Sequence, residues 1–240
     1  IDVYQRSGIY PVPMPGGIGL EAAGVVEAVG KGVDRIKVGD RVAYAGGPAG
    51  AYAETRVMPA VHLVEVPDGV SDQQAAAILL KGMTVQFLIH RTYRVQPGET
   101  VLFHAAAGGV GLIACQWLKA LGVRVIGTVS TDEKAALAKA HGCEHTILYK
   151  KENVAERVRE LTNGEGVPVV YDSVGKETWE TSLSCLRPLG LMVSFGNTTG
   201  AIEPFSVGQL AAKGSLFLTR PVLATYVAKP NDLQSTARSV

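Results

Sequence analysis

The strongest constraint in this sequence is a regular alternation of apolar, strand-like runs with amphipathic, helix-like segments that begins near Gln96. The runs typical of strands are 100–104, 123–130, 145–149, 167–175, 191–196 and 214–221, and the segments typical of helices are 110–121, 131–142, 152–164 and 177–190. Strands that alternate with helices require crossover connections, which build a parallel sheet covered on both faces. The sequence therefore predicts an α/β fold with a doubly wound parallel sheet, whose ligands bind at the carboxyl ends of the strands.

The part of the chain before residue 83 has a different texture. Its runs 22–30, 40–45 and 51–58 are short, alternating or apolar, and they are separated by turn-forming residues, which is typical of a mainly β domain. Ser71 and Gln74 have the spacing of a capping box, so a helix is expected to begin there. We therefore predict a mainly β domain over 1–82 and an α/β domain over 83–222.

Composition excludes several function classes. The chain has 240 residues, of which 47% are hydrophobic, so it can bury one large core or two modest ones. Its net charge of +1 provides no field that would attract nucleic acid or an anionic membrane. The longest uncharged run, 101–118, is interrupted by His104 and by glycines, so it is interpreted as strand, turn and helix. The 3 cysteines lack a C-x-x-C spacing, which favours a reducing, cytoplasmic location.

The glycine-rich segment AAAGGVG, residues 105–111, lies between a predicted strand and a predicted helix. Compared with the dinucleotide-binding pattern G-x-G-x-x-G, it has Ala106 in place of the first glycine and retains Gly108 and Gly111. Gly108 would let the backbone approach a pyrophosphate, and Gly111 would let the helix pack on the strand. The helix amino terminus, with Gly109 and Val110, would offer N–H groups to the phosphates. The alternative is that the glycines only shape a tight turn.

The residue that would choose the cofactor is not acidic. An NAD site usually has Asp or Glu about 20 residues beyond the glycine turn, where it hydrogen-bonds the ribose 2′-hydroxyl, and here Ser130 holds that place. Lys134 follows early in the next helix and Tyr149 ends the next strand, so both could contact a 2′-phosphate. The alternative is a solvated lysine and a packed tyrosine, and Asp132 and Glu133 add opposing charge. The pattern favours NADPH over NADH.

Six segments together resemble a known family: 21–44, 79–84, 102–122, 169–175, 190–197 and 213–221. They are similar to the zinc-free NADPH:quinone oxidoreductases, the ζ-crystallin-like branch of the medium-chain dehydrogenases/reductases. The resemblance implies a GroES-like catalytic domain beside a Rossmann domain, with 223–240 as the start of a return to the catalytic domain. It also implies a homodimer whose sheet continues across the Rossmann edge strand, for which 214–221 is the candidate.

No metal site is expected. Zinc alcohol dehydrogenases of the same superfamily carry G-H-E where this chain has Gly19, Leu20 and Glu21, and leucine cannot bind a metal. The chain also lacks a four-cysteine lobe, and its 5 histidines show no ligand spacing. His104 is interpreted as a histidine at a strand end whose hydrogen bonds are satisfied within the fold, and not as a ligand or a base.

Without a Lewis acid, a suitable substrate is a quinone or conjugated enone, because it accepts hydride and spreads the negative charge over its own π system. The resemblance implies that Tyr4 lies beside the nicotinamide and that Thr84 lies near the ribose or amide of the cofactor. It further places around the cofactor Ser173, Val174, Phe195, Gly196 and Asn197. Tyr4 could donate a hydrogen bond or proton to the reduced oxygen, and the alternative is a packing residue.

Two other functions stay open. One is an enoyl-thioester reductase, which uses the same hydride and a tyrosine proton donor but needs a basic approach for the phosphates of the carrier. The other is an NADPH-binding sensor or structural protein without catalysis. Family members extend beyond both ends of this chain, so the resemblance implies a partial catalytic domain, and the chain alone is expected to bind NADPH weakly, to aggregate and to reduce quinones poorly.

Overall fold

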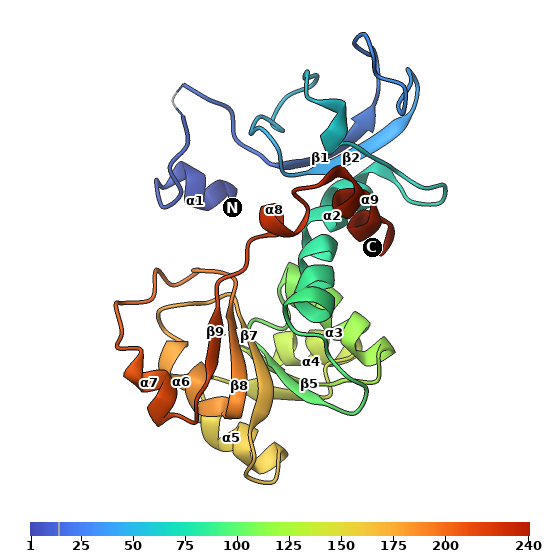
Figure 1. The fold of residues 1–240 in the computed structure, drawn as a ribbon. Coiled ribbons are helices and arrows are strands. Elements are labelled where there is room, and N and C mark those ends of the chain that lie inside the picture. The colour runs from blue at the N-terminus through green and yellow to red at the C-terminus, as the bar shows by residue number, and fades with distance from the viewer. Residues whose placement is uncertain (14) are drawn as a thin grey trace. The chain divides into compact units, whose positions relative to one another are not determined.

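A computed structural model describes residues 1–13 and 15–240 (Figure 1). The chain forms two compact units, of which unit 1 comprises residues 1–84 and 223–240 and unit 2 comprises residues 85–222. The division falls inside helix α2 (Asp72–Phe87), just after Thr84.

Unit 2 is built on a parallel sheet of 6 strands with the spatial order β6-β5-β4-β7-β8-β9. The strands are β4 (Thr100–Phe103), β5 (Arg124–Val129), β6 (His145–Leu148), β7 (Val167–Asp172), β8 (Leu186–Ser194) and β9 (Phe217–Thr219). This is the order of the doubly wound dinucleotide-binding fold, in which the strand order reverses between the first and fourth strands. The predicted fold class is confirmed, and the reversal falls between β4 and β7.

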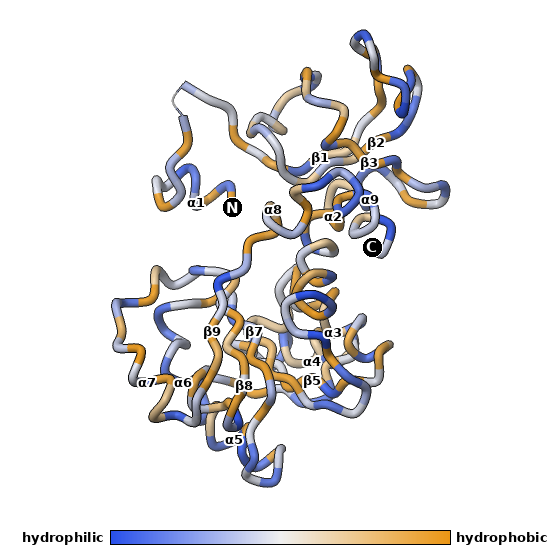
Figure 2. Tube along the Cα trace, viewed as in Figure 1, coloured by the Kyte–Doolittle hydropathy of each residue, from blue (hydrophilic) through white to orange (hydrophobic). Residues whose placement is uncertain are grey.

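Helices cover both faces of this sheet. The helices are α3 (Gly109–Ala120), α4 (Asp132–Ala140), α5 (Val154–Leu161), α6 (Trp179–Cys185) and α7 (Gly208–Ala212), and a π-helical turn, η2 (Leu88–Thr92), follows α2. Helices α3 and α4 contact each other on one face, and α5 and α6 contact each other on the other (Figure 1). The strands of this sheet are mostly hydrophobic (Figure 2), as expected for a sheet covered on both faces. All of β7 is buried.

Unit 1 contains an antiparallel sheet in the order β1-β2-β3. Its elements are α1 (Asp2–Arg6), β1 (Glu21–Val25), β2 (Arg41–Ala45), η1 (Ala60–His62), β3 (Val64–Glu65), the first part of α2, α8 (Leu223–Tyr226) and α9 (Pro230–Arg238). Ala43 and Val64 of the sheet pack with Leu79 and Met83 of α2 and with Leu233 of α9. Helix α9, near the end of the chain, therefore shares a core with the antiparallel sheet and helix α2.

The predicted capping box at the start of α2 is confirmed. The Ser71 N–H donates to Gln74 Oε1 at 2.9 Å, and the Gln74 N–H donates to Ser71 Oγ at 3.2 Å. The two side chains thus satisfy each other's backbone N–H groups, which the first turn of the helix leaves without partners.

The helix predicted over 177–190 is wrong in its second half. Helix α6 ends at Cys185, and β8 begins at once with Leu186, whose φ of −75° and ψ of 143° are extended. Pro188 explains the early end, because proline has no N–H for a helical hydrogen bond and disfavours helical geometry at the residue before it.

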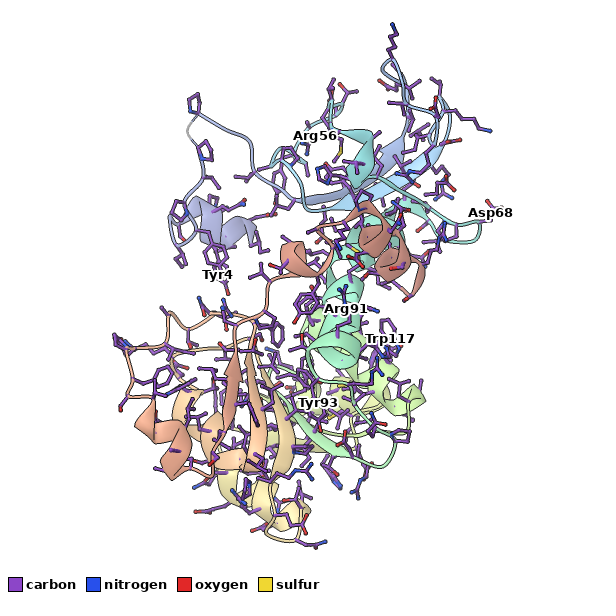
Figure 3. The ribbon with its side chains drawn as sticks, viewed as in Figure 1. Tyr4, Arg56, Asp68, Arg91, Tyr93 and Trp117 are labelled. Atoms are coloured by element: carbon purple, nitrogen blue, oxygen red, sulfur yellow. The ribbon has the colours of Figure 1, made fainter. Side chains whose placement is uncertain are left out.

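The strand-like run 51–58 does not form a strand, and an unexpected helix, α1, forms near the amino terminus. Val57 in this run is 99% exposed, so its apolar residues do not line a buried face. Arg56 (labelled in Figure 3) instead lies over the Tyr44 ring, 5.2 Å from its centroid, and donates to Tyr44 Oη at 3.0 Å. The apolar pattern alone could not show that this segment attaches through an arginine.

We expect Gly127→Ala to lower the free energy of unfolding by about 1–3 kcal/mol, because the new methyl group overfills a packed core. A Cβ at Gly127 in β5 would lie 2.5 Å from Ala106 Cβ and 2.7 Å from Cys143 Sγ. Gly208→Ala is the matched control, since its Cβ meets only Ser206 Oγ at 3.4 Å among the described atoms. Urea unfolding measures the difference, and equal midpoints for the two variants would contradict it.

Candidate functional site

The glycine turn connects β4 to α3 through a tight backbone path. Ala105 has a φ of 52°, in the left-handed region, and its carbonyl accepts the Gly108 N–H at 2.8 Å. A Cβ on Gly111 would lie 2.5 Å from the Ala105 oxygen, so a glycine is needed for α3 to pack this closely. A Cβ on Gly108 would meet only that oxygen, at 3.1 Å, among the described atoms within 4 Å. Gly111 therefore serves packing, and Gly108 lies on the exposed side of the turn.

The amino terminus of α3 is arranged to receive an anion. Gly108 is its N-cap, and no side chain caps the helix. The first N–H groups of an α-helix, here those of Gly109 and Val110, have no acceptor within the helix, and the helix dipole favours negative charge beside them. Gly108, Gly109 and Val110 thus lie together at the edge where a doubly wound fold binds the pyrophosphate of a dinucleotide.

The loop that follows β7 is held by a buried carboxylate. Asp172 Oδ1 accepts the N–H groups of Val174 at 2.7 Å and Gly175 at 3.0 Å. Asp172 is 0% exposed, so these bonds lie out of contact with solvent. The loop therefore has a fixed course at the point where the strand order reverses. Asp172 was not singled out from the sequence, although it lies within a segment that carries the family resemblance.

The loops after β7 and β8 lie against each other. Thr198 N donates to the Ser173 carbonyl at 3.2 Å, and Thr199 N donates to that of Val174 at 2.9 Å. A Cβ on Gly196 would clash with the Ser173 carbonyl oxygen, so glycine permits this approach. The structure thus brings together five residues expected at the cofactor: Ser173, Val174, Phe195, Gly196 and Asn197.

The residues expected to recognise a 2′-phosphate lie at the ends of β5 and β6. Ser130 directly follows β5, and the Tyr149 N–H donates to the Val129 carbonyl beside it at 3.2 Å. Lys134 is exposed in the first turn of α4, where its N–H donates to Thr131 Oγ1 at 3.3 Å. Ser130, Lys134 and Tyr149 thus gather around one edge, and Tyr149 is 50% exposed there.

The acidic residues beside this edge have partners. Asp132 Oδ2 accepts from Lys151 Nζ at 3.0 Å. The backbone N–H of Glu133 and then the Thr131 hydroxyl lower the pKa of the Glu133 carboxyl, because both stabilise its charged form. Lys151 was not singled out from the sequence, and it offsets the negative charge that had counted against a phosphate here.

Two expected cofactor residues, Tyr4 and Thr84, belong to unit 1, whereas the others belong to unit 2. Tyr4 lies in α1, where its ring meets that of Tyr10 edge-on with centroids 5.2 Å apart (Figure 3). The Thr84 hydroxyl donates to the Leu80 carbonyl at 2.7 Å within α2. The roles implied for these two side chains stay predictions.

The residues around Leu20 do not fit a zinc site. The carboxylate of the adjacent Glu21 accepts from Lys81 Nζ at 3.1 Å through Oε1 and from the Leu80 N–H at 3.4 Å through Oε2. Lysine is a cation and not a metal ligand under ordinary conditions, so this carboxylate is matched to an ammonium group. Across residues 1–13 and 15–240, His, Cys, Asp and Glu form no group of 3 or more that could hold a metal ion.

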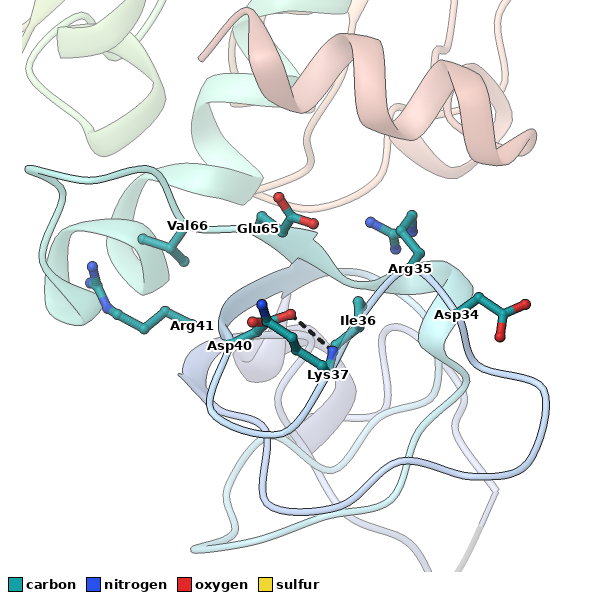
Figure 4. A pocket seen from close by; sticks show the side chains of 8 residues that line it. All are labelled: Asp34, Arg35, Ile36, Lys37, Asp40, Arg41, Glu65 and Val66. Carbon is teal, nitrogen blue, oxygen red and sulfur yellow. Dashed lines mark hydrogen bonds between the residues drawn. The ribbon is translucent and has the colours of Figure 1, made fainter.

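A charged depression in unit 1 is lined by Asp34, Arg35, Ile36, Lys37, Asp40, Arg41, Glu65 and Val66 (Figure 4). Arg35 donates to the Leu63 carbonyl at 2.7 Å, and Arg41 donates to Asp72 Oδ1 at 2.6 Å. The Lys37 N–H donates to Asp40 Oδ2 at 2.9 Å (Figure 4). These charges hold loops of the unit together, so we assign the depression no chemistry.

Two family models match this chain, over separate ranges. The family model of the alcohol dehydrogenase GroES-like domain matches residues 1–68, and that of the zinc-binding dehydrogenases matches residues 109–234. A quinone oxidoreductase of Pseudomonas aeruginosa is 60% identical over 238 residues, which are 99% of this chain and 73% of that protein. A 2-haloacrylate reductase of a Burkholderia species is 47% identical over 99% of this chain and 74% of its own length.

Solved structures give the same relationship. The quinone oxidoreductase of Escherichia coli, crystallised with NADPH, superposes with a TM-score of 0.98 at 51% identity, over 99% of this chain and 73% of that chain. The fold and the glycine turn define a dinucleotide-dependent oxidoreductase of the medium-chain dehydrogenase/reductase superfamily. Within that class, the chain belongs to the quinone oxidoreductase family. Among the described residues, no helix is long and apolar enough to cross a membrane.

Proposed function

We propose that this protein transfers a hydride from NADPH to quinones or related conjugated carbonyls without a metal ion. The proposal rests on the features that meet at the carboxyl ends of the strands in the unit 2 sheet. These are the glycine turn, the uncapped start of α3 and the paired loops after β7 and β8. These features occur in a member of the quinone oxidoreductase family, and the similar Escherichia coli enzyme was crystallised with NADPH.

The choice of NADPH is argued from charge. A carboxylate at the end of β5 would repel a 2′-phosphate, and Ser130 removes that repulsion. Lys134 supplies an exposed ammonium group in the first turn of the next helix. Lys151 pairs with Asp132 at 3.0 Å and so reduces the opposing negative charge. Because these charges and that of Glu133 cancel, the preference for a phosphate rests on Ser130 in place of an acid and on the exposed ammonium group of Lys134.

The proposed mechanism needs little from the protein beyond binding and orientation. NADPH, when bound, supplies the hydride from its nicotinamide ring. The first N–H groups of α3 would hold the pyrophosphate, and the loops around Ser173 and Gly196 would border the nicotinamide. A quinone or enone distributes the added negative charge over its own π system, so no Lewis acid is required. The Tyr4 hydroxyl is the proposed hydrogen-bond donor to the reduced oxygen.

A second substrate class has one observation in its favour. The similarity to a 2-haloacrylate reductase, at 47% identity, suggests that conjugated acids could take the place of the quinone. Enoyl thioesters would use the same hydride and the same tyrosine.

A role as a non-enzymatic NADPH-binding protein is disfavoured, because the chain belongs to an enzyme family.

The decisive experiment follows NADPH consumption with 1,4-benzoquinone, 2-chloroacrylate and a crotonyl thioester as separate substrates. We expect the highest kcat/KM with the quinone, no stoichiometric zinc by elemental analysis, and the same rate with EDTA. Gly108→Val is the control for the site, because a side chain on the exposed side of the turn would stand between backbone and pyrophosphate. Faster turnover of either other substrate would replace the quinone as the preferred substrate, whereas no turnover of any of the three, or activity that EDTA abolishes and zinc restores, would overturn the proposal.

Cofactor choice is tested by titrating the protein with NADPH and with NADH. We expect tighter binding of NADPH, and we expect Lys134→Ala to remove most of that preference, since a hydrogen bond to a charged group contributes about 1.5–3 kcal/mol. Lys139→Ala is the matched control, because Lys139 is also exposed on α4 but lies in its last turn. Equal affinities of the unaltered protein for the two cofactors would refute the assignment.

We further propose a homodimer formed along β9, one of the two edge strands of the sheet in unit 2. Phe217 is 59% exposed and Leu218 is 36% exposed, so this edge presents apolar side chains beside unpaired backbone groups. A second copy of the chain could add its own edge strand there and cover both. The resemblance to the quinone oxidoreductases points to the same edge.

The dimer proposal predicts that Phe217→Asp lowers the molar mass in solution from dimer to monomer, because a charge in an apolar interface is strongly unfavourable. Val207→Asp is the control, since Val207 is 75% exposed but lies outside the edge strand. Light scattering after size-exclusion chromatography measures both. A monomeric unaltered protein, or a Phe217→Asp variant that stays dimeric, would contradict the proposal.

A further inference from the structure

A chain of buried polar side chains lies directly beneath the point where the strand order reverses. His104 follows β4, Thr128 lies in β5, Asp172 ends β7 and Ser182 lies in α6. Their exposed fractions are 2%, 2%, 0% and 0%. Buried polar groups are unfavourable unless each is hydrogen-bonded, so a connected set of four in an otherwise apolar layer calls for a specific explanation.

The direction of every hydrogen bond that links these four side chains can be assigned. Asp172 as a carboxylate only accepts, so the Ser182 hydroxyl donates its single proton to Asp172 Oδ2 at 2.7 Å. Ser182 Oγ must then accept from His104 Nε2 at 3.0 Å. In the neutral ring Nδ1 is left as an acceptor, and it receives the Thr128 hydroxyl proton at 2.9 Å. Burial lowers the pKa of His104 and so favours this neutral ring, although the charge of Asp172 opposes the shift.

The two ends of this series of hydrogen-bonded side chains reach the two loops of the proposed cofactor site. At one end Thr128 Oγ1 accepts the N–H of Ala105, the first residue of the glycine turn, at 3.3 Å. At the other end Asp172 Oδ1 accepts the N–H groups of Val174 and Gly175 at 2.7 and 3.0 Å. All donors point toward Asp172, so the chain is a single continuous path from one loop to the other.

We infer that His104 is a positioning residue, whose neutral ring with the proton on Nε2 sets the spacing between the glycine turn and the loop after β7. This inference rests on the proposed binding of NADPH at that edge. His104 is too deeply buried to touch the substrate, and its role is to hold in place the two loops whose other backbone groups meet the cofactor. Loss of the ring should therefore weaken cofactor binding and leave the reaction of the bound cofactor unchanged.

The test compares His104→Leu with His104→Gln and Ser182→Ala. We expect His104→Leu and Ser182→Ala each to raise the Kd and KM for NADPH about tenfold, while kcat at saturating NADPH stays within about twofold. Gln at position 104 can donate to Ser182 from its amide nitrogen, and we expect it to restore most of the affinity. The double variant His104→Leu with Ser182→Ala should be no worse than either single variant, because both break the same path.

Thr162→Val is the matched control for a general loss of stability. The Thr162 hydroxyl accepts the Gly166 N–H at 2.9 Å, and Gly166 precedes β7 at the opposite edge of the sheet. We expect this variant to unfold more readily yet to bind NADPH normally. If His104→Leu and Thr162→Val were destabilised alike and both bound NADPH normally, His104 would be only a structural residue and the inference would fail. If the unaltered protein did not bind NADPH, the proposed function itself would fail.

Discussion

The close packing of helix α3 on the glycine turn is the contact on which the rest of unit 2 depends. A Cβ at Gly111 would lie 2.5 and 2.6 Å from the carbonyl oxygens of Ala105 and Ala106, so no other residue permits this distance. Strand β5 presses on the same turn from another direction, because a Cβ at Gly127 would lie 2.5 Å from Ala106 Cβ. The turn is thus confined between a helix and a strand, and its backbone N–H groups are the part left to meet a ligand.

The buried hydrogen-bonded side chains beneath the turn have a different effect from the apolar contacts around them. Apolar side chains such as Leu102 and Val170 fill space but impose no direction, whereas each hydrogen bond fixes both a distance and an orientation. A buried carboxylate such as Asp172 is a weak source of stability, since removing it from water opposes what its bonds contribute. Its retention is better explained by the geometry it gives to the loop at Val174 and Gly175.

The sequence allowed the sheet of unit 2 and its glycine turn to be predicted because both depend on local patterns. Strand and helix periods could be counted directly, and the spacing of Gly108 and Gly111 has a known steric meaning. Helix 177–190 is predicted too long because the apolar pattern continues past Cys185, where the helix ends ahead of Pro188. The hydrogen bonds of His104 could not be derived, since Thr128 and Ser182 are 24 and 78 residues away in the chain. Its interpretation as a histidine satisfied within the fold is confirmed, whereas the identity of its partners required the structure.

The segment around Leu20 shows how a fold shared with zinc enzymes can accommodate different chemistry. The family model of the zinc-binding dehydrogenases matches residues 109–234, outside the segment around Leu20, and within that segment the carboxylate of Glu21 accepts from Lys81 and from the Leu80 N–H. A positive charge is therefore still present beside this carboxylate, but it is an ammonium group that cannot polarise a substrate oxygen as a metal ion does. The proposed substrates suit a site with an ammonium group in place of a metal ion, because a quinone stabilises added negative charge in its own ring. Under the proposed function, precision is required chiefly at the carboxyl-end edge of the unit 2 sheet, where the buried hydrogen bonds of His104 and Asp172 converge.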